Sequence, residues 1–358
     1  MTTKMAIIGY GGMGQWHHKC ILKNVPEITV KGAYDVRSEA LETATDAGLH
    51  TYDSLQSALS DPEVGIVLIA TTNEVHKDIA IAALEAGKHV ICEKPVTMNA
   101  AELEEIAPVA KKSGKIFTIH HNRRWDKDFV TARKILTDDT IGKPYYIETR
   151  VQGARRNMHG WRGYVINGGG MVLDWGIHLL DQLLYMIDSP VVSVDSHLFQ
   201  VFSSEVEDNF KTFLRFGNGL SAMVEISTNC FIFQPRWHIS CEGGTAVIDN
   251  FSCEGKIVKL ICDEQMGWAD EIVYTAAGPT RTMAPRPNHT METLPLPEIT
   301  EDFGDYHENT SPFYKNFVKA LKGEEKQVVT IDQALRVMKL IDLIFKCANQ
   351  GHGEKCNI

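Results

Sequence analysis

Residues 9–14 of the chain read Gly-Tyr-Gly-Gly-Met-Gly, and this glycine-rich stretch decides the fold. It directly follows an apolar segment typical of a strand, Met5–Gly9, and it opens a segment with helical periodicity, Met13–Lys23. In such a turn the first glycine permits the tight bend, the second lets the backbone approach a pyrophosphate, and the third allows the helix to pack closely on the strand. The stretch therefore predicts a Rossmann domain that binds a dinucleotide.

The end of the next predicted strand indicates which dinucleotide is bound. Asp35 ends the strand Thr29–Asp35, about 20 residues after the glycine turn, where a carboxylate can accept hydrogen bonds from ribose hydroxyls. This favours NAD. Arg37 and Ser38 follow at once and could instead hold a 2′-phosphate, so NADP remains an alternative.

Up to residue 122 the chain alternates short β-branched segments with helical segments, which is typical of βαβ units around a parallel sheet. The predicted strands are Met5–Gly9, Thr29–Asp35, Gly65–Ala70, His89–Cys92 and Lys115–His120. The predicted helices are Met13–Lys23, Ser38–Ala47, Val75–Ala86 and Ala100–Ser113. We therefore expect residues 1–122 to form one doubly wound dinucleotide-binding domain.

After residue 122 the pattern changes to strand-like alternation with short glycine turns, which indicates hairpins. The predicted strands are Tyr145–Val151, Val191–Phe202, Asn209–Phe216, Leu220–Ser227, Trp237–Glu242, Thr245–Asn250 and Lys256–Ile261. Helices are predicted at Asp126–Leu136 and Met171–Ile187, and a final helix at Ile331–Ala348 could pack back on the first domain. Residues 278–297 are expected to be a long surface arm. The predicted fold class is an α/β Rossmann domain plus an α+β domain, residues 123–358, with a large, mostly antiparallel, open-faced sheet.

The composition narrows the class of partner. A formal net charge of -10 leaves no overall basic field for nucleic-acid phosphates or anionic lipids, so neither nucleic acid nor membrane is expected as a partner. No apolar segment approaches the roughly 20 residues that span a bilayer, and the N-terminus enters a strand, which predicts a cytoplasmic protein. The eight cysteines lack the spacing of a zinc site, so we expect reduced thiols and no metal.

Further motifs follow the glycine turn. Residues 92–95 read Cys-Glu-Lys-Pro, residues 70–76 read Ala-Thr-Thr-Asn-Glu-Val-His, residues 121–124 read His-Asn-Arg-Arg, and Gly169-Gly170 precede Asp174 and His178. Jointly these motifs resemble those of the Gfo/Idh/MocA family, which includes inositol dehydrogenase and glucose–fructose oxidoreductase. One departure is Thr72, where relatives often have proline.

Asp174 and His178 are four residues apart on a predicted helix, so both side chains can face one substrate hydroxyl. The resemblance implies that Lys94, Asp174 and His178 form the catalytic group, with His178 as general base, a role suited to an ordinary imidazole pKa near 6.5. The residues expected to bind the cofactor are Gly9, Gly11, Gly12, Met13, Gly14, Asp35, Arg37, Thr71, Asn73, His76, Glu93 and Lys94. Those expected to bind the substrate are Asn122, Arg123, Arg156, Asn157, Trp161, Asp174 and His178.

The resemblance implies an NAD(P)-dependent oxidoreductase that transfers hydride between the nicotinamide and a secondary hydroxyl of a sugar, glycoside or cyclic polyol. Two alternatives stay open: oxidation of a glycoside at C3 in support of redox-assisted cleavage, and a non-catalytic NAD-sensing regulator of sugar metabolism. Because the sheet of this family is usually open on one face, which then needs a cover, a homo-oligomer is also expected.

Overall fold

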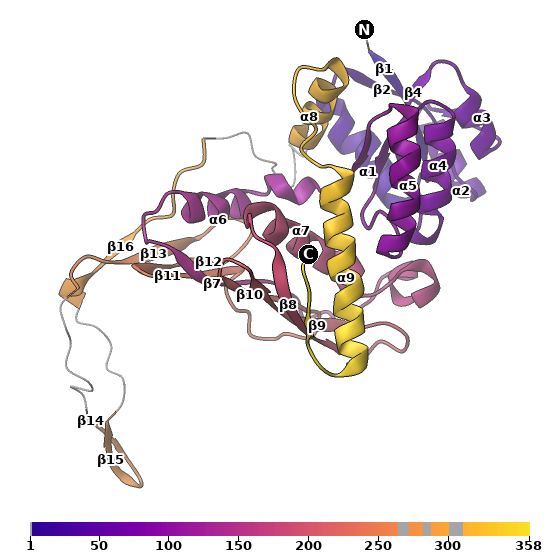
Figure 1. Ribbon diagram of the computed structural model, residues 1–358. Coiled ribbons are helices and arrows are strands. Elements are labelled where there is room, and N and C mark those ends of the chain that lie inside the picture. Colours follow the sequence, from indigo (N-terminus) through magenta and orange to yellow (C-terminus); the bar gives the residue numbers. More distant parts are fainter. Residues whose placement is uncertain (1, 264–271, 282–287, 301–310) are drawn as a thin grey trace.

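The computed structural model describes residues 2–263, 272–281, 288–300 and 311–358, which fold into two domains (Figure 1). A six-stranded sheet, in which neighbouring strands are parallel, forms the centre of the first domain. A nine-stranded, mostly antiparallel sheet forms the centre of the second. The predicted fold class is thus confirmed.

The first sheet has the strand order β3-β2-β1-β4-β5-β6. Its strands are β1 (Thr3–Ile8), β2 (Ile28–Tyr34), β3 (His50–Thr51), β4 (Val64–Ile69), β5 (His89–Cys92) and β6 (Phe117–Ile119). The helices of this domain include α2 (Ser38–Asp46), α3 (Leu55–Ser60), η3 (Asn73–Val75), α4 (His76–Glu85) and α5 (Ala100–Ser113). The order reverses between β1 and β4, and in open parallel sheets ligands bind at the carboxyl ends of the strands beside such a reversal.

The first helix differs from the predicted regular helix over Met13–Lys23. The segment is divided into α1 (Gly12–Trp16), a wider π-helical turn η1 (His17–Ile21) and a short η2 (Leu22–Asn24). The π-helical turn begins at His17, whose side chain is fully buried and reaches Glu93 after β5. Such local widening often accompanies functional sites, and periodicity alone does not reveal it.

The second sheet has the strand order β16-β13-β12-β11-β7-β10-β9-β8-β17, in which β7 and β10 run parallel. Its strands are β7 (Pro144–Gln152), β8 (Val191–Phe199), β9 (Asn209–Phe216), β10 (Ser221–Ser227), β11 (Trp237–Cys241), β12 (Gly244–Ile248), β13 (Gly255–Leu260), β16 (Met291–Leu294) and β17 (Glu354–Lys355). A separate hairpin pairs β14 (Ile272–Thr275) with β15 (Gly278–Arg281).

Residues 278–297, expected to form a long surface arm, are largely exposed where they are described and include the short strands β15 and β16; residues 282–287 lie outside the described residues. Strand β16 extends the edge of the large sheet by pairing with β13. Both strands have four residues, which is too short for alternation of apolar and polar side chains to stand out in the sequence.

The helical segments of the second domain cover its sheet and connect the domains. They are η4 (Asn122–Trp125), α6 (Lys127–Thr137), η5 (Gly160–Gly163), η6 (Val165–Asn167), η7 (Val172–Gly176), α7 (Ile177–Met186), η8 (Asn288–Thr290), α8 (Ser311–Lys322) and α9 (Ile331–Gln350). Figure 1 shows α9 running from beside the first domain along the second. Among the described helices, none is long and apolar enough to cross a membrane.

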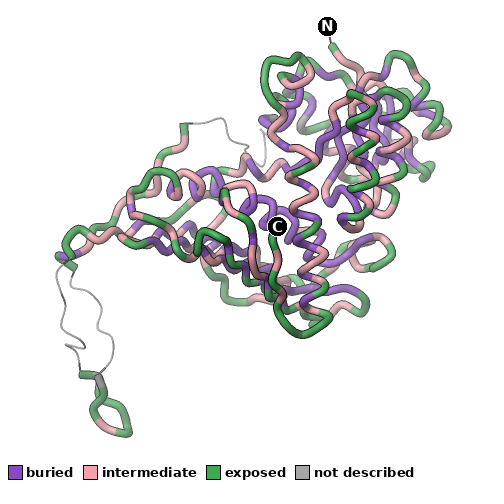
Figure 2. Tube along the Cα trace, in the orientation of Figure 1, coloured by how far each residue is buried: buried purple, intermediate pink, exposed green. Residues whose placement is uncertain are grey.

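A buried ion pair of the second domain lies beside its junction with the first. Arg124, from η4, donates to both carboxylate oxygens of Asp181 on α7, at 2.6 and 2.8 Å, and also to Gln333 in the first turn of α9. Helix α9 contacts the first domain as well, because Asp342 accepts the backbone N–H of Ala100 at the start of α5. Figure 2 shows buried residues through the first domain and the middle of the second, and mostly exposed or intermediate residues toward the edge that carries β16. The packed part of each domain therefore lies beside the junction.

Candidate functional site

A cavity of about 830 Å³ opens between the two domains, a size typical of small-molecule sites. The first domain lines it with Met13, Trp16, Glu93, Lys94 and His120. The second domain contributes, among others, Asn122, Arg123, Arg156, Asn157, Arg162, Asp174, Trp175 and His178. The cavity thus collects residues from the carboxyl ends of the parallel strands and from the helix that the sequence singled out.

The glycine turn fits a dinucleotide pyrophosphate. Gly9 has φ +92°, and a Cβ there would lie 2.6 Å from the carbonyl oxygen of Ala70; a Cβ on Gly14 would lie 2.2 Å from the carbonyl oxygen of Gly9. These two positions therefore require glycine. A Cβ on Gly12 would meet no atom within 4 Å, so the start of α1 is open where phosphates approach a helix N-terminus.

Asp35 and Arg37 form one unit beside this turn. The Asp35 carboxylate accepts the backbone N–H of Tyr10 at 2.8 Å and that of Arg37 at 2.9 Å, and the Arg37 guanidinium donates to both of its oxygens at 3.1 Å. Burial alone would raise the pKa of Asp35, but the hydrogen bonds from Arg37 and Tyr10 hold it below its usual value. The carboxylate is therefore ionised at the place where the ribose hydroxyls are expected. It also forms an ion pair with the Arg37 guanidinium.

Lys94 connects the two domains at the cavity. Its Nζ lies 2.8 Å from the main-chain oxygen of Asp174 and 3.0 Å from Oδ1 of the same residue, while Nε of Arg162 lies 3.1 Å from Oδ2. Burial would raise the pKa of Asp174, but the positive charges of Lys94 and Arg162 lower it below its usual value. Asp174 is therefore a carboxylate held between two cations. Arg162 is not among the site residues expected above.

The segment that carries Asp174 and His178 is not the single α-helix predicted for Met171–Ile187. It starts with the π-helical turn η7 and continues as α7. At the junction, Gly176 packs so closely on the sheet that a Cβ would lie 2.7 Å from the Phe210 ring. Both Asp174 and His178 still line the cavity, although through a wider turn than a regular α-helix would give.

His178 is only 5% exposed and lies edge-on to Trp175, with ring centroids 5.9 Å apart. Its Nδ1 is buried without a hydrogen-bond partner among the described residues. Burial, reinforced by the charges of Lys94 and Arg123, lowers the pKa of His178 well below 6.5. This corrects the expectation of an ordinary imidazole pKa, because the sequence does not show how deeply the side chain is buried.

The residues expected to bind substrate do not all reach the cavity. Asn122, Arg123, Arg156 and Asn157 line it. Trp161 is not part of the lining and instead lies under the Arg162 guanidinium, 4.6 Å from the ring centroid.

Two residues expected along the cofactor make internal contacts. Asn73 donates to the main-chain oxygen of Gly168 at 2.9 Å and so joins the domains. His76 is fully buried, and its ring nitrogens contact the carbonyl oxygens of Pro95 at 2.9 Å and Thr71 at 3.3 Å. The expectation that His76 binds the cofactor is therefore corrected, because its polar atoms already hold two loops together.

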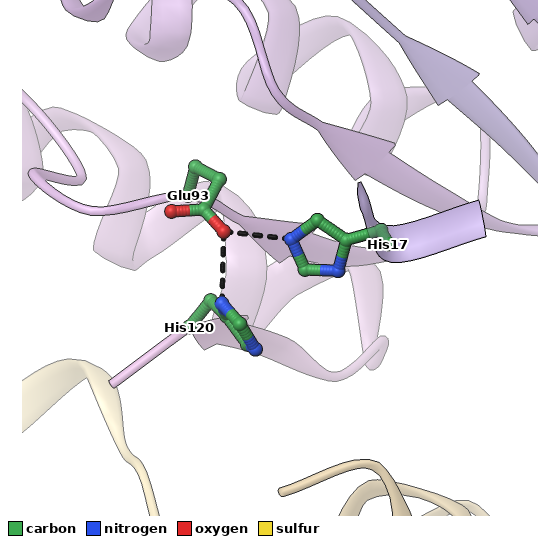
Figure 3. A group of neighbouring side chains, drawn as sticks. All are labelled: His17, Glu93 and His120. Carbon is green, nitrogen blue, oxygen red and sulfur yellow. Dashed lines mark hydrogen bonds and ion pairs between the residues drawn. The ribbon is translucent and has the colours of Figure 1, made fainter. Parts of the chain in front are cut away.

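Glu93 belongs to a buried cluster that the sequence analysis missed. Figure 3 shows His17 and His120 pointing at the same carboxylate oxygen, Oε1, at 2.7 and 2.8 Å. Within the described parts of the chain, these three side chains are the group whose donor atoms could hold a metal ion. Two ligands of a tetrahedral zinc ion would lie about 3.3 Å apart for bonds of about 2.0 Å, so the shorter distances fit hydrogen bonds better. The sequence held one clue, since His120 ends the predicted strand that follows the one ending at Cys92.

Comparison with known proteins places the chain. Residues 3–121 match the family described as "Oxidoreductase family, NAD-binding Rossmann fold", and residues 129–247 match the GFO/IDH/MocA C-terminal domain. A solved NAD-binding protein from Listeria innocua is 39% identical, with a TM-score of 0.87 over 99% of this chain and 97% of that chain. The chain belongs to the Gfo/Idh/MocA family. Its first domain is accordingly an NAD-binding Rossmann domain.

Some curated relatives of this Gfo/Idh/MocA protein are named as polyol dehydrogenases. An inositol 2-dehydrogenase of Salmonella typhimurium is 32% identical over 154 residues, which are 42% of this chain and 46% of that protein. The scyllo-inositol 2-dehydrogenase (NADP(+)) IolW of Bacillus subtilis is 32% identical over 141 residues, 39% of each protein. Both matches span less than half of the relative's own length.

The Asp35–Arg37 unit predicts the cofactor preference. Asp35→Ala should weaken NAD binding roughly 10- to 100-fold, because hydrogen bonds from ribose hydroxyls to a charged acceptor are lost, while the released Arg37 supports a 2′-phosphate. The matched variant Arg37→Ala should weaken NADP binding more than NAD binding. Calorimetry with both dinucleotides measures these affinities, and tighter binding of NADP than NAD by the unmodified protein would contradict the assignment.

Proposed function

We propose that the protein oxidises a secondary hydroxyl of a sugar, glycoside or cyclic polyol, with NAD as the hydride acceptor. The observation that carries this proposal is the meeting of Lys94, Asp174 and His178 from two domains in one cavity beside the dinucleotide turn. The relatives named as inositol dehydrogenases support the polyol class. The same grouping of an ammonium, a carboxylate and a neutral imidazole favours an enzyme over a non-catalytic sensor.

Lys94 is placed to stabilise negative charge on the substrate oxygen. An ammonium group has three N–H donors, and two of them are used by the main-chain oxygen and Oδ1 of Asp174. The third donor remains for a substrate hydroxyl that becomes an alkoxide as hydride leaves carbon. Asp174, ionised and paired with Lys94 and Arg162, orients the ammonium group and does not supply a proton.

His178 is the group that accepts the hydroxyl proton. Its lowered pKa keeps the imidazole neutral at physiological pH, so a lone pair is available for the transfer. The cofactor, when bound, supplies the hydride acceptor. The neighbouring charges of Lys94 and Arg123 that lower the pKa also favour onward loss of the proton, which suits the oxidative direction.

The cavity wall suits a polyhydroxylated ring. Polar side chains that could meet several hydroxyls lie around it: Asn122, Gln152, Asn157, His159, Ser227 and Thr228. Trp175 offers an aromatic face, although Arg123 already lies over that ring, 4.3 Å from the centroid. These groups support a carbohydrate-like substrate and do not select one stereoisomer.

The role of His178 is tested by turnover. His178→Ala should reduce the rate of NADH formation with myo-inositol, scyllo-inositol or a glucoside by roughly 10²- to 10⁴-fold, the range for loss of positioned proton transfer. NAD affinity, followed by calorimetry, should stay unchanged, and the matched variant His238→Ala on the large sheet should keep full turnover. Near-normal turnover in His178→Ala together with its loss in Lys94→Ala would move the base to Lys94.

The pH dependence follows from the lowered pKa of His178. A base with a lowered pKa loses its proton at lower pH, so the oxidation rate should already be constant at neutral pH and should fall only well below pH 6.5. The pH profile of kcat measures this directly. A rising limb centred above pH 6.5 that disappears in His178→Ala would show that the imidazole is not in the environment described.

We also propose a homo-oligomer formed through the outer face of the large sheet. Side chains alternate along β9, so that Phe213 faces outward and is 47% exposed, and Phe199 on β8 shares this face at 44% exposure. Apolar rings on an open sheet face favour contact with a second copy. Light scattering should show an oligomer that Phe213→Glu dissociates and that Val36→Glu, a change of an exposed apolar residue in the first domain, leaves intact. A monomeric unmodified protein at working concentration would contradict this proposal.

A further inference from the structure

The buried cluster around Glu93 is not used by the mechanism above. It joins three parts of the first domain, since His17 begins η1, Glu93 follows β5 and His120 follows β6. Tyr314, from α8, completes it with a 2.8 Å hydrogen bond to Nδ1 of His17. These side chains are nearly or wholly shielded from solvent, with at most 5% of any residue exposed.

The positions of the protons in this cluster follow from its hydrogen bonds. Burial would raise the pKa of Glu93, but His120 and His17 hold it well below its usual value, so the carboxylate only accepts. Nε2 of His17 and Nδ1 of His120 must therefore both donate to Oε1. Burial raises the pKa of Tyr314, so its hydroxyl stays protonated and donates a hydrogen bond to Nδ1 of His17. Every polar atom of His17 is thus satisfied.

His120 is different, because one of its nitrogens has no partner. Nε2 is buried and makes no hydrogen bond with any described residue. A proton on Nδ1 is accepted by Glu93, whereas a proton on Nε2 would meet no acceptor among the described residues, so this geometry favours the tautomer that leaves a lone pair on Nε2. A buried acceptor without a hydrogen bond costs free energy. Since the contact with Glu93 holds Nε2 of His120 in this position, we expect a bound ligand to supply the missing donor.

The surroundings of His120 indicate which ligand brings that donor. Its side chain lines the cavity together with Met13, Trp16 and Lys94, all from the NAD-binding domain. A Rossmann sheet consists of two mononucleotide-binding halves; the glycine turn and Asp35 belong to the half of β1–β3, while Glu93 and His120 directly follow strands β5 and β6 of the other half. Because the adenosine side of the dinucleotide is assigned to β1–β3, we expect the nicotinamide nucleoside to bind beside the other half of the sheet.

We propose that Glu93 orients His120 so that Nε2 accepts a hydrogen bond from the nicotinamide nucleoside, given by a ribose hydroxyl or by the carboxamide N–H. His17 and Tyr314 are positioning residues that fix the carboxylate for this purpose. The inference rests on the proposed function only in assigning the cavity to the cofactor's reactive half. It is tested by binding alone, so failure of turnover and failure of this contact are distinguishable.

The test compares NAD with ADP, which lacks the nicotinamide nucleoside. Calorimetry should show that His120→Phe weakens NAD binding roughly 5- to 50-fold, as expected for loss of one hydrogen bond to a buried acceptor, and leaves ADP binding unchanged. His120→Gln, which returns an acceptor near the Nε2 position, should recover part of the loss. The control His50→Phe, at an exposed histidine on β3, should change neither affinity. Unchanged NAD binding in His120→Phe, or an equal loss for NAD and ADP, would overturn the proposal.

A dinucleotide analogue distinguishes the two donors. 3-Acetylpyridine adenine dinucleotide keeps the ribose hydroxyls but has no carboxamide N–H. If the loss caused by His120→Phe persists with this analogue, the donor is the ribose, and if it vanishes, the donor is the carboxamide. Either result supports the contact.

Nitrogen NMR of the histidine-labelled, unmodified protein gives evidence that does not depend on a variant folding. Nε2 of His120 should be unprotonated in the free protein, and its resonance should shift on addition of NAD but not of ADP. A protonated Nε2 in the free protein, or equal shifts with both nucleotides, would contradict the proposal.

Discussion

The ion pair between Lys94 and Asp174 is the contact on which the site depends. Lys94 belongs to the loop after β5 of the parallel sheet, and Asp174 belongs to the π-helical turn before α7 in the other domain. Their side chains are only 15% and 11% exposed, so Lys94 would be a poorly solvated charge without Asp174, which also pairs with Arg162 of its own domain. Placement of the ammonium group therefore requires contact between the two domains, because Asp174, the ion-pair partner of Lys94, belongs to the second domain.

The rest of the junction keeps that contact in place. Arg124 and Asp181 form a second buried pair behind α7, and Asn73 reaches Gly168 across the domains. On the far side of Lys94, the Glu93 carboxylate is held by two histidines and accepts the backbone N–H of Lys94 at 3.1 Å. Lys94 thus has a fixed backbone on one side and a fixed carboxylate partner on the other. Electrostatic stabilisation of a transition state requires this kind of arrangement before the substrate arrives.

The sequence predicts those parts of the site that depend on local geometry or on a distinctive motif. Gly9 and Gly14 could be assigned because their backbone positions exclude a side chain, and Asp35 because it ends the second strand of a βαβ unit. Lys94, Asp174 and His178 were found through the family motifs and do line one cavity. The parts that were missed depend on contacts between distant segments. His17 pairs with Glu93 across 76 residues, and Arg162 of η5 lies 3.1 Å from Asp174 of η7. Periodicity carries no information about either contact, nor about the full burial that makes His76 structural and lowers the pKa of His178.

The proposed function requires the nicotinamide ring to face Lys94, Asp174 and His178. A crystal structure of the complex with NADH would test this most directly, through the position of the nicotinamide C4 atom. We expect the pyrophosphate to lie on the glycine turn and C4 to face the cavity within reach of a substrate carbon held by Lys94 and His178. A nicotinamide ring outside the cavity, or one whose C4 faces away from these side chains, would contradict it.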